Sequence, residues 1–287
     1  MSLTQQQRDY SRNWVWSNLH RGHSPKVLAA ELRKHGMPEH EIKAIFSEAY
    51  EAETDAINYQ ALSNCRLTQQ MDRKPGLERL PTPNAQVFTW ENFLSGDDCQ
   101  KTIECIDRNL KPSTVTDTRG ETRTHVDTRV RTSSTCTLGL QPDPFVLDLN
   151  RRISAALGIH WSYSEAIQGQ KYEVGQEFKS HTDYFEPGAA EHLPNTAERG
   201  QRTWTFMIYL NSTPEGGETR FPRLEKLLRP KQGMAVIWNN LNADGSVNPF
   251  TLHHGMKPRQ GEKYIITKWF RERGWGPMFE DPGFSKL

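Results

Sequence analysis

The 287-residue sequence has few cysteines, no long apolar run and no excess of charge of either sign. Its 36 lysine and arginine residues nearly balance its 35 aspartate and glutamate residues, so the overall charge gives no reason to expect nucleic acid or a membrane surface as a partner. No apolar stretch approaches the roughly 18 residues of a membrane-spanning helix, and the first residues lack the apolar segment of a secretion signal. We therefore expect a cytoplasmic protein.

The cysteines show no spacing that is typical of a zinc site. Thiols stay reduced in the cytoplasm, which argues against disulfide bonds. We interpret all four as structural residues: Cys65, Cys99, Cys105 and Cys136.

The distribution of apolar residues and prolines divides the chain into three parts. Residues 1–62 carry apolar side chains at a spacing near 3.6 residues, which predicts a small helical N-terminal domain. Three prolines within 63–84 indicate a linker. Residues 85–287 contain short strand-like segments separated by glycine, proline and asparagine, with a helix predicted over 144–157. The pattern predicts an α+β protein whose main domain is an antiparallel β barrel or jelly roll.

Two parts of this organisation leave alternatives open. The helical domain either recognises a partner or a polypeptide substrate, or it is an appendage for packing or for forming a homodimer. Residues 111–128 are polar and lack periodicity, which is typical either of a functional lid or of a surface loop.

His181 and Asp183 are two residues apart in a strand-like segment, so their side chains face the same way. One imidazole and one carboxylate make half of a metal site. His253 and His254 offer a further imidazole, and the residue types alone do not decide between them. Two histidines and one carboxylate form the facial triad of non-haem Fe(II) oxygenases, which leaves neighbouring coordination positions open.

A lysine begins a later strand-like segment of the chain. Alternation places Lys263 on one face with Ile265, Thr267 and Trp269. A lysine on an otherwise apolar, inward face requires a buried anion. Near a facial triad, such a lysine can pair with the far carboxylate of a dicarboxylic acid.

These residues belong to a series of motifs that are specific through their order and spacing together. In chain order the motifs are Val87-Phe-Thr-Trp-Glu-Asn-Phe-Leu-Ser, Arg131-Thr-Ser-Ser, Gln170-Lys-Tyr172, His181-Thr-Asp183, Thr205-Phe-Met-Ile-Tyr-Leu, Gly216-Gly-Glu-Thr219-Arg-Phe-Pro, His253-His-Gly and Gly261-Glu-Lys263. With them, the sequence from about Val87 to Gly274 resembles the prolyl 4-hydroxylase branch of the Fe(II)/2-oxoglutarate oxygenases.

The resemblance implies a double-stranded β-helix (jelly roll) flanked by helices, with Fe(II) and 2-oxoglutarate as cofactors and L-ascorbate as a further expected one. It implies His181, Asp183 and His253 as catalytic metal ligands. The choice of His253 follows because the family's oxoglutarate-binding lysine lies ten residues beyond the last ligand, as Lys263 lies beyond His253.

The resemblance also assigns residues around the metal and its co-substrate. Two hydroxyl groups are expected to contact the far carboxylate of 2-oxoglutarate beside the lysine, those of Thr205 and Tyr172. The expected substrate channel contains Arg131, Tyr184, Glu218 and Trp238, although Trp238 equally fits the role of a core aromatic residue.

The implied activity is hydroxylation of a substrate C–H bond, with succinate and CO₂ as products and a prolyl residue in a peptide or protein as the expected substrate. Two alternatives are hydroxylation of another residue or of a small molecule, and a catalytically silent metal-binding protein used for interaction. An intact oxoglutarate lysine argues against the silent protein. The chain departs from the family at His254, where an alanine is usual, and at Met256-Lys257-Pro258, where Cys-Pro-Val is usual.

Overall fold

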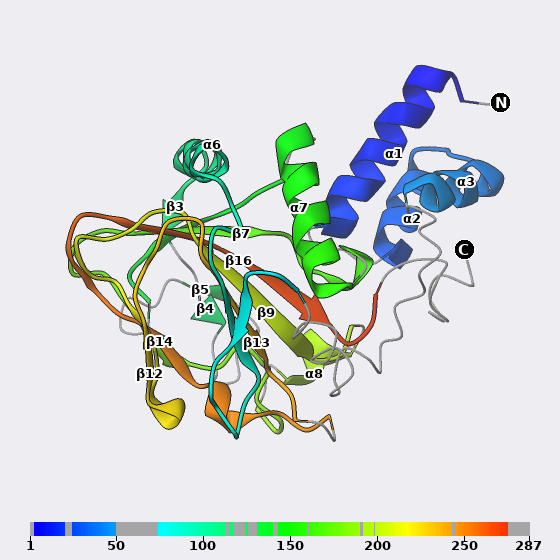
Figure 1. Ribbon diagram of the computed structural model, residues 1–287. Coiled ribbons are helices and arrows are strands. Elements are labelled where there is room, and N and C mark those ends of the chain that lie inside the picture. The colour runs from blue at the N-terminus through cyan, green and yellow to red at the C-terminus, as the bar shows by residue number, and fades with distance from the viewer. Residues whose placement is uncertain are drawn as a thin grey trace.

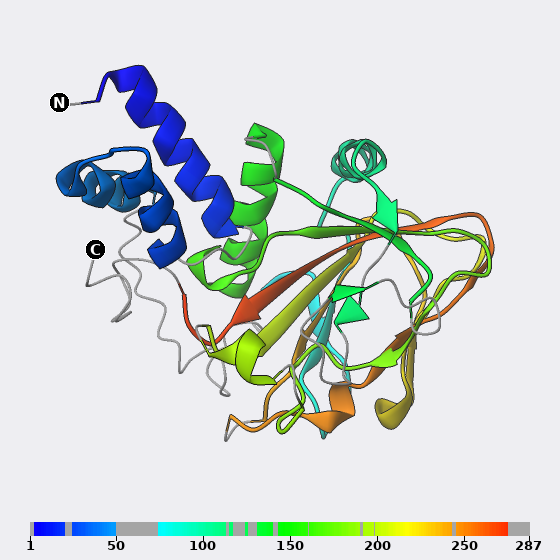
Figure 2. The same ribbon diagram turned by 180° about the vertical axis from the view of Figure 1, so that it is seen from behind.

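The computed structural model describes residues 3–20, 25–49, 74–112, 115–116, 124–125, 131–139, 143–159, 161–189, 192–197, 199–242 and 245–274. Within them, the chain forms a large and a small antiparallel β-sheet, with helices on one side of the large sheet (Figures 1 and 2). Cys65 and residues 50–62 of the predicted helical domain lie outside the described residues.

The large sheet has eight strands within the described residues, in the order β1-β2-β13-β9-β16-β7-β6-β3. Their bounds are β1 Leu77–Arg79, β2 Val87–Trp90, β13 Ala235–Asn239, β9 Arg202–Tyr209, β16 Lys263–Arg271, β7 Gln168–Tyr172, β6 Ser134–Thr137 and β3 Lys111–Pro112. Alternate residues of β9 face opposite sides, so Trp204, Phe206 and Ile208 join the helix-side core while Met207 and Tyr209 face the other sheet.

The small sheet has four strands in the described part of the chain, in the order β12-β11-β14-β8. These are β12 Lys226–Leu228, β11 Thr219–Phe221, β14 His253–Gly255 and β8 Phe178–His181. Apolar side chains of both sheets form one core between them, in which Trp238 and Ile265 of the large sheet meet Phe221 of the small one. The two packed antiparallel sheets confirm the predicted jelly-roll class.

Shorter elements complete the fold. Two strand pairs are β10 Glu215–Gly216 with β15 Pro258–Gln260, and β4 Val115–Thr116 with β5 Thr124–His125. Three 3₁₀ turns are η1 Trp161–Tyr163, η2 Pro222–Leu224 and η3 Pro249–Thr251, and a short helix is α8 His192–Thr196.

Helices α6 Gly96–Asp107 and α7 Pro144–Leu157 cover the outer side of the large sheet. Ser95 caps α6 by accepting a hydrogen bond from the backbone N–H of Asp98, and Asp143 caps α7 in the same way. Gly158 ends α7 in a left-handed conformation, with φ of 68°, which glycine adopts without strain. The helix predicted over 144–157 has these bounds in the structure.

Three helices, α1 Gln5–His20, α2 Pro25–Lys34 and α3 Glu39–Ala49, precede the sheets and pack beside α7 (Figure 1). Their apolar faces form a separate small core from side chains such as Val15, Leu28, Ile42 and Phe46. Trp161 of the β-rich part completes this core. None of the described helices combines the length and apolar character that crossing a membrane requires.

The structure differs from the predicted organisation at the linker. Residues 77–79 of the range 63–84 form β1, which pairs with β2 as the edge of the large sheet. Of the predicted polar segment 111–128, the described residues form the short strands β3, β4 and β5. Cys99, Cys105 and Cys136 are buried and free.

Candidate metal centre and cofactor pocket

Three side chains that are far apart in the sequence meet between the two sheets. His181 ends β8, Asp183 follows two residues later, and His253 begins β14 directly opposite His181 in the sheet register. One ligand atom from each lies within 4.8 Å of the others. The Oδ1 atom of Asp183 is 3.8 Å from Nε2 of His181 and 3.9 Å from Nε2 of His253. Two imidazoles and one carboxylate are the donor set of a facial triad.

Backbone carbonyl groups fix the tautomer of both imidazoles. Nδ1 of His181 lies 2.8 Å from the carbonyl oxygen of Lys179, and Nδ1 of His253 lies 2.9 Å from that of Thr251. A carbonyl oxygen only accepts, so each Nδ1 carries the proton and each Nε2 presents its lone pair. Such contacts orient histidine ligands in metal sites.

The protonation states also suit a cation. Burial, followed by the neighbouring His253, lowers the pKa of His181 to about 3, so this imidazole is neutral at pH 7. Burial alone would raise the pKa of Asp183, but the two histidines, Arg202 and Thr205 together lower it below the ordinary value. The centre therefore offers neutral imidazole and ionised carboxylate.

Aromatic rings hold the two imidazoles in place. The ring of Phe178 stacks on that of His181 with centroids 3.5 Å apart, and the guanidinium of Arg131 lies 4.6 Å from the centre of the Phe178 ring. Trp238 meets His253 edge to face at 4.8 Å. Both imidazoles thus have little freedom to rotate away from Asp183.

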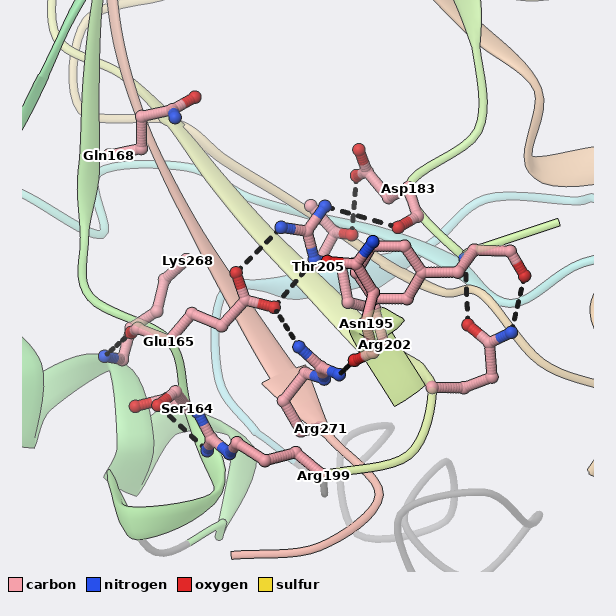
Figure 3. Close-up of polar contacts among 12 residues, drawn as sticks. Ser164, Glu165, Gln168, Asp183, Asn195, Arg199, Arg202, Thr205, Lys268 and Arg271 are labelled. Carbon is pink, nitrogen blue, oxygen red and sulfur yellow. Dashed lines mark hydrogen bonds and ion pairs between the residues drawn. The ribbon is translucent and has the colours of Figure 1, made fainter. Parts of the chain in front are cut away.

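Two residues, Thr205 and Arg202, form hydrogen bonds to Asp183 (Figure 3). The hydroxyl of Thr205 donates a 2.7 Å hydrogen bond to Oδ2 of Asp183, and Nη1 of Arg202 lies 3.4 Å from the backbone oxygen of Asp183. Arg202 is itself paired with Glu165 through two contacts of 2.7 Å, and Glu165 also accepts from Arg271 at 3.0 Å. Burial alone would raise the pKa of Glu165, but its arginine neighbours lower it to about 2.

The three ligands open into a pocket of about 380 Å³, open solvent at its mouth included. Lys263 lies in this pocket with a fully buried side chain, and its Nζ has no hydrogen-bond partner among the described residues. Burial lowers the pKa of Lys263 to about 7, against the opposing effect of Glu218. Its Nζ lies 5.1 Å and 5.5 Å from the ring centres of Tyr172 and Tyr209. An ammonium group in such a place requires an anionic ligand.

The predicted alternation along β16 holds, since Lys263, Ile265, Thr267 and Trp269 all line the pocket. Tyr172 also lines it and lies opposite Lys263 in the register of β7 and β16, but its hydroxyl donates to Oε1 of Gln170 at 2.7 Å.

The structure places Thr205 elsewhere than expected. The sequence predicts its hydroxyl beside the far carboxylate of 2-oxoglutarate, next to Lys263. Thr205 instead lies opposite Trp269, six residues along β16 from Lys263, so the two backbones are roughly 20 Å apart. Its hydroxyl is committed to Asp183. Thr205 is therefore a partner of the metal ligand.

The four expected channel residues are not brought together on one surface. Trp238 lines the pocket and is also part of the core between the sheets. Arg131 is buried and donates to Ser133 at 2.9 Å. Tyr184 and Glu218 are buried as well, outside the pocket lining.

The two adjacent histidines have separate roles. His253 faces Asp183, whereas Nε2 of His254 lies 2.9 Å from Oε2 of Glu177. Lys257, within the segment that departs from the family, lies 3.5 Å from the other oxygen of Glu177. These differences from the family lie beside the metal centre and leave its ligand set unchanged.

Several residues of the pocket and of the neighbouring ion-pair cluster were not identified from the sequence. Phe178, Gln170 and Thr219 line the pocket, and the last two occur within motifs that were noted without a role. The ion-pair cluster around Glu165 lacks any local signal, because its carboxylate and its arginine partners are 37 and 106 residues apart.

Comparison with known proteins agrees with this geometry. The sequence model of the 2OG-Fe(II) oxygenase superfamily matches residues 167–271, which include all three candidate ligands and Lys263. The chain is 33% identical over 208 residues to probable prolyl 4-hydroxylase 10 of Arabidopsis thaliana, covering 66% of this chain and 69% of the relative. It is 33% identical over 211 residues to prolyl 4-hydroxylase 5 of the same plant, covering 64% and 70%. A solved structure of the viral collagen prolyl hydroxylase of Paramecium Bursaria Chlorella virus-1 shares 22% identity with a TM-score of 0.49, over 70% of this chain and 98% of that chain.

Proposed function

The chain belongs to the prolyl 4-hydroxylase family of the 2OG-Fe(II) oxygenases, and from that premise we propose that it hydroxylates a prolyl residue in a peptide or protein. One observation supports the cofactor chemistry. The His-Asp-His centre and the buried Lys263, whose Nζ has no hydrogen-bond partner among the described residues, lie in one pocket. The names of its relatives support the prolyl substrate.

The residues present fit both implied cofactors. Two imidazoles and one carboxylate suit Fe(II), and they leave neighbouring coordination positions open. The buried ammonium of Lys263 has no hydrogen-bond partner in the described part of the chain, so it suits the far carboxylate of 2-oxoglutarate. When bound, iron and 2-oxoglutarate together supply the activation of O₂, in which the decarboxylation of 2-oxoglutarate to succinate and CO₂ is coupled to hydroxylation of a C–H bond.

The protein's own contribution is binding, orientation and exclusion of water. His181, Asp183 and His253 hold the metal, and Lys263 fixes the distance of the co-substrate from it. The ring of Phe178 covers one face of the His181 imidazole, and the ring of Trp238 packs against His253. Ascorbate dependence, homodimer formation and location in the cytoplasm stay predictions of the sequence.

The cofactor chemistry is tested by adding 2-oxoglutarate anaerobically to the Fe(II)-loaded protein and recording the visible charge-transfer absorption. We expect a band in the wild type that is lost in Asp183→Ala and weakened in Lys263→Met. A wild type that binds iron but gives no band would refute the oxygenase function and favour the silent metal-binding protein.

The substrate is tested by supplying matched peptides that differ only in one proline replaced by alanine. Mass spectrometry should find the added mass of one oxygen atom on the proline, with succinate formed in equal amount. Succinate formation that depends on another residue, or only on a free small molecule, would exclude the prolyl substrate and leave the cofactor chemistry intact.

A further inference from the structure

Asp183 uses its two oxygen atoms for different purposes. Oδ1 is the atom that faces both imidazoles, at 3.8 Å and 3.9 Å. Oδ2 accepts the hydroxyl hydrogen bond of Thr205 at 2.7 Å (Figure 3). The carboxylate itself is almost fully buried, so water does not compete for Oδ2.

Thr205 is in turn fixed by a second buried side chain, that of Asn240. Nδ2 of Asn240 lies 2.9 Å from the hydroxyl oxygen of Thr205. An ionised carboxylate only accepts, so the single hydroxyl proton goes to Asp183 and the amide group must donate to Thr205. The backbone of Asn240 is anchored as well, since its N–H donates to Thr203 at 2.7 Å and its carbonyl accepts from Asn248 at 2.8 Å.

The amide nitrogen of Asn240 is hydrogen-bonded to Thr205, whereas its amide oxygen has no partner among the described residues. Oδ1 of Asn240 is buried and has no hydrogen-bond partner in the described part of the chain. Buried polar atoms are nearly always paired, so an unpaired one calls for an explanation. In the observed orientation the amide donates to the hydroxyl oxygen of Thr205, so the hydroxyl of Thr205 is left to donate to Asp183.

Thr205 and Asn240 therefore affect whether Asp183 binds a metal through one oxygen or through both. A carboxylate that binds through one oxygen leaves three of six coordination positions for the two oxygens of 2-oxoglutarate and for O₂. A carboxylate that binds through both oxygens takes one of those positions. The hydrogen bond from Thr205 occupies one acceptor position of Oδ2 and orients the carboxylate, which leaves Oδ1 as the oxygen that faces both imidazoles.

We propose that Asn240 and Thr205 are positioning residues that restrict Asp183 to one metal-binding oxygen. The proposal rests on the Fe(II) and 2-oxoglutarate function proposed above, and it replaces the expectation that Thr205 contacts the co-substrate. The relay works through geometry and hydrogen bonding, and neither side chain belongs to the lining of the pocket.

The test compares Thr205→Val, which keeps the shape and removes the hydroxyl, with Thr205→Ser, which keeps the hydroxyl. Mn²⁺ affinity, and then 2-oxoglutarate affinity of the Mn²⁺-loaded protein, are measured by calorimetry. Loss of the partner of a metal ligand typically weakens metal binding about 10- to 100-fold, so we expect such a loss in Thr205→Val and recovery in Thr205→Ser. The anaerobic charge-transfer band of the Fe(II) and 2-oxoglutarate complex should shift in Thr205→Val only.

A matched control lies two residues earlier on the same strand and the same face. Thr203 is equally buried, and its hydroxyl donates to the backbone oxygen of Phe270 at 3.1 Å. Thr203→Val removes a buried hydrogen bond without touching a metal ligand, so it should leave both affinities and the band unchanged. Equal weakening in Thr203→Val and Thr205→Val would mean a general packing effect and overturn the proposal.

Asn240→Leu extends the test to the second member of the relay. Alone it should weaken Mn²⁺ and 2-oxoglutarate binding, and combined with Thr205→Val it should add little, because both changes break the same chain of hydrogen bonds. Wild-type affinities in Thr205→Val would refute the relay while leaving the oxygenase function in place. A wild type that binds neither Mn²⁺ nor 2-oxoglutarate would instead refute the function.

Discussion

The affinity for 2-oxoglutarate should fall steeply as the pH rises above 7, because the ammonium of Lys263 is already losing its proton there. Burial lowers the pKa of Lys263 to about 7 in the free protein. Binding of a dicarboxylate supplies the missing counter-charge and raises the pKa again, so the complex holds the proton over the whole range. The contribution of this contact to the affinity is therefore complete well below pH 7 and decreases as the pH rises through and above 7.

The size of the effect follows from that one pKa. Only the charged fraction of Lys263 binds the carboxylate, so the apparent affinity falls about fivefold between pH 7 and pH 8 and about 50-fold between pH 7 and pH 9. At pH 8 the free protein has lost about nine-tenths of the proton, so binding must take up nearly one proton.

Calorimetry on the Mn²⁺-loaded protein measures both quantities, since proton uptake appears as a dependence of the binding enthalpy on the buffer. Lys263→Arg is the matched control, because a guanidinium stays charged and should remove the pH dependence. Any pH dependence that persists in this variant belongs to the metal centre instead. An affinity of the wild type that stays constant from pH 6 to pH 9, without proton uptake, would refute the reasoning.

Three further outcomes follow from the structure. Glu165→Gln should lower the free energy of unfolding in urea by about 3 kcal/mol, because it leaves the buried guanidinium of Arg271 and the mostly buried one of Arg202 without their carboxylate. Glu91→Gln in an exposed ion pair should change it by less than about 1 kcal/mol. With a pKa of about 2, the contribution of Glu165 should be complete above its unperturbed pKa of 4.5 and disappear as the pH falls toward 2, which urea titrations at several pH values check. His253→Ala should abolish Mn²⁺ binding in calorimetry while His254→Ala retains it, and loss in both would contradict the separate roles of the two histidines. Gly216→Ala should destabilise the protein by about 2 kcal/mol or more in thermal unfolding, because φ is +78° and an added Cβ would lie 2.4 Å from a backbone oxygen; an unchanged midpoint would contradict this.

Local patterns in the sequence were sufficient for much of the fold and for the residues that face the pocket. The apolar spacing within 144–157 predicted α7 with its observed bounds. Alternation along β16 predicted which side chains share the pocket with Lys263, because side-chain direction in a strand depends only on the position along it.

Contacts between distant strands could not be predicted in this way. Thr205 was expected beside Lys263, yet the strand register places it opposite Trp269 and beside Asp183. A motif identifies a residue and its strand, but the partner of its hydroxyl depends on how neighbouring strands are aligned. Asn240 had no motif at all, and only the pairing of β13 with β9 brings it near Thr205.

The position of Trp161 limits how the chain can be shortened into separate domains. Its indole is buried among the apolar side chains of α1, α2 and α3, although it belongs to the turn that follows α7. The sequence boundary between a helical region and a β-rich region is thus crossed by one shared hydrophobic core. Deleting residues 1–49 would leave a large indole exposed in the 3₁₀ turn four residues before Glu165, whose carboxylate belongs to the ion-pair cluster next to Asp183. The helices α1, α2 and α3 cover this indole, and a chain without them would expose an apolar surface in their place.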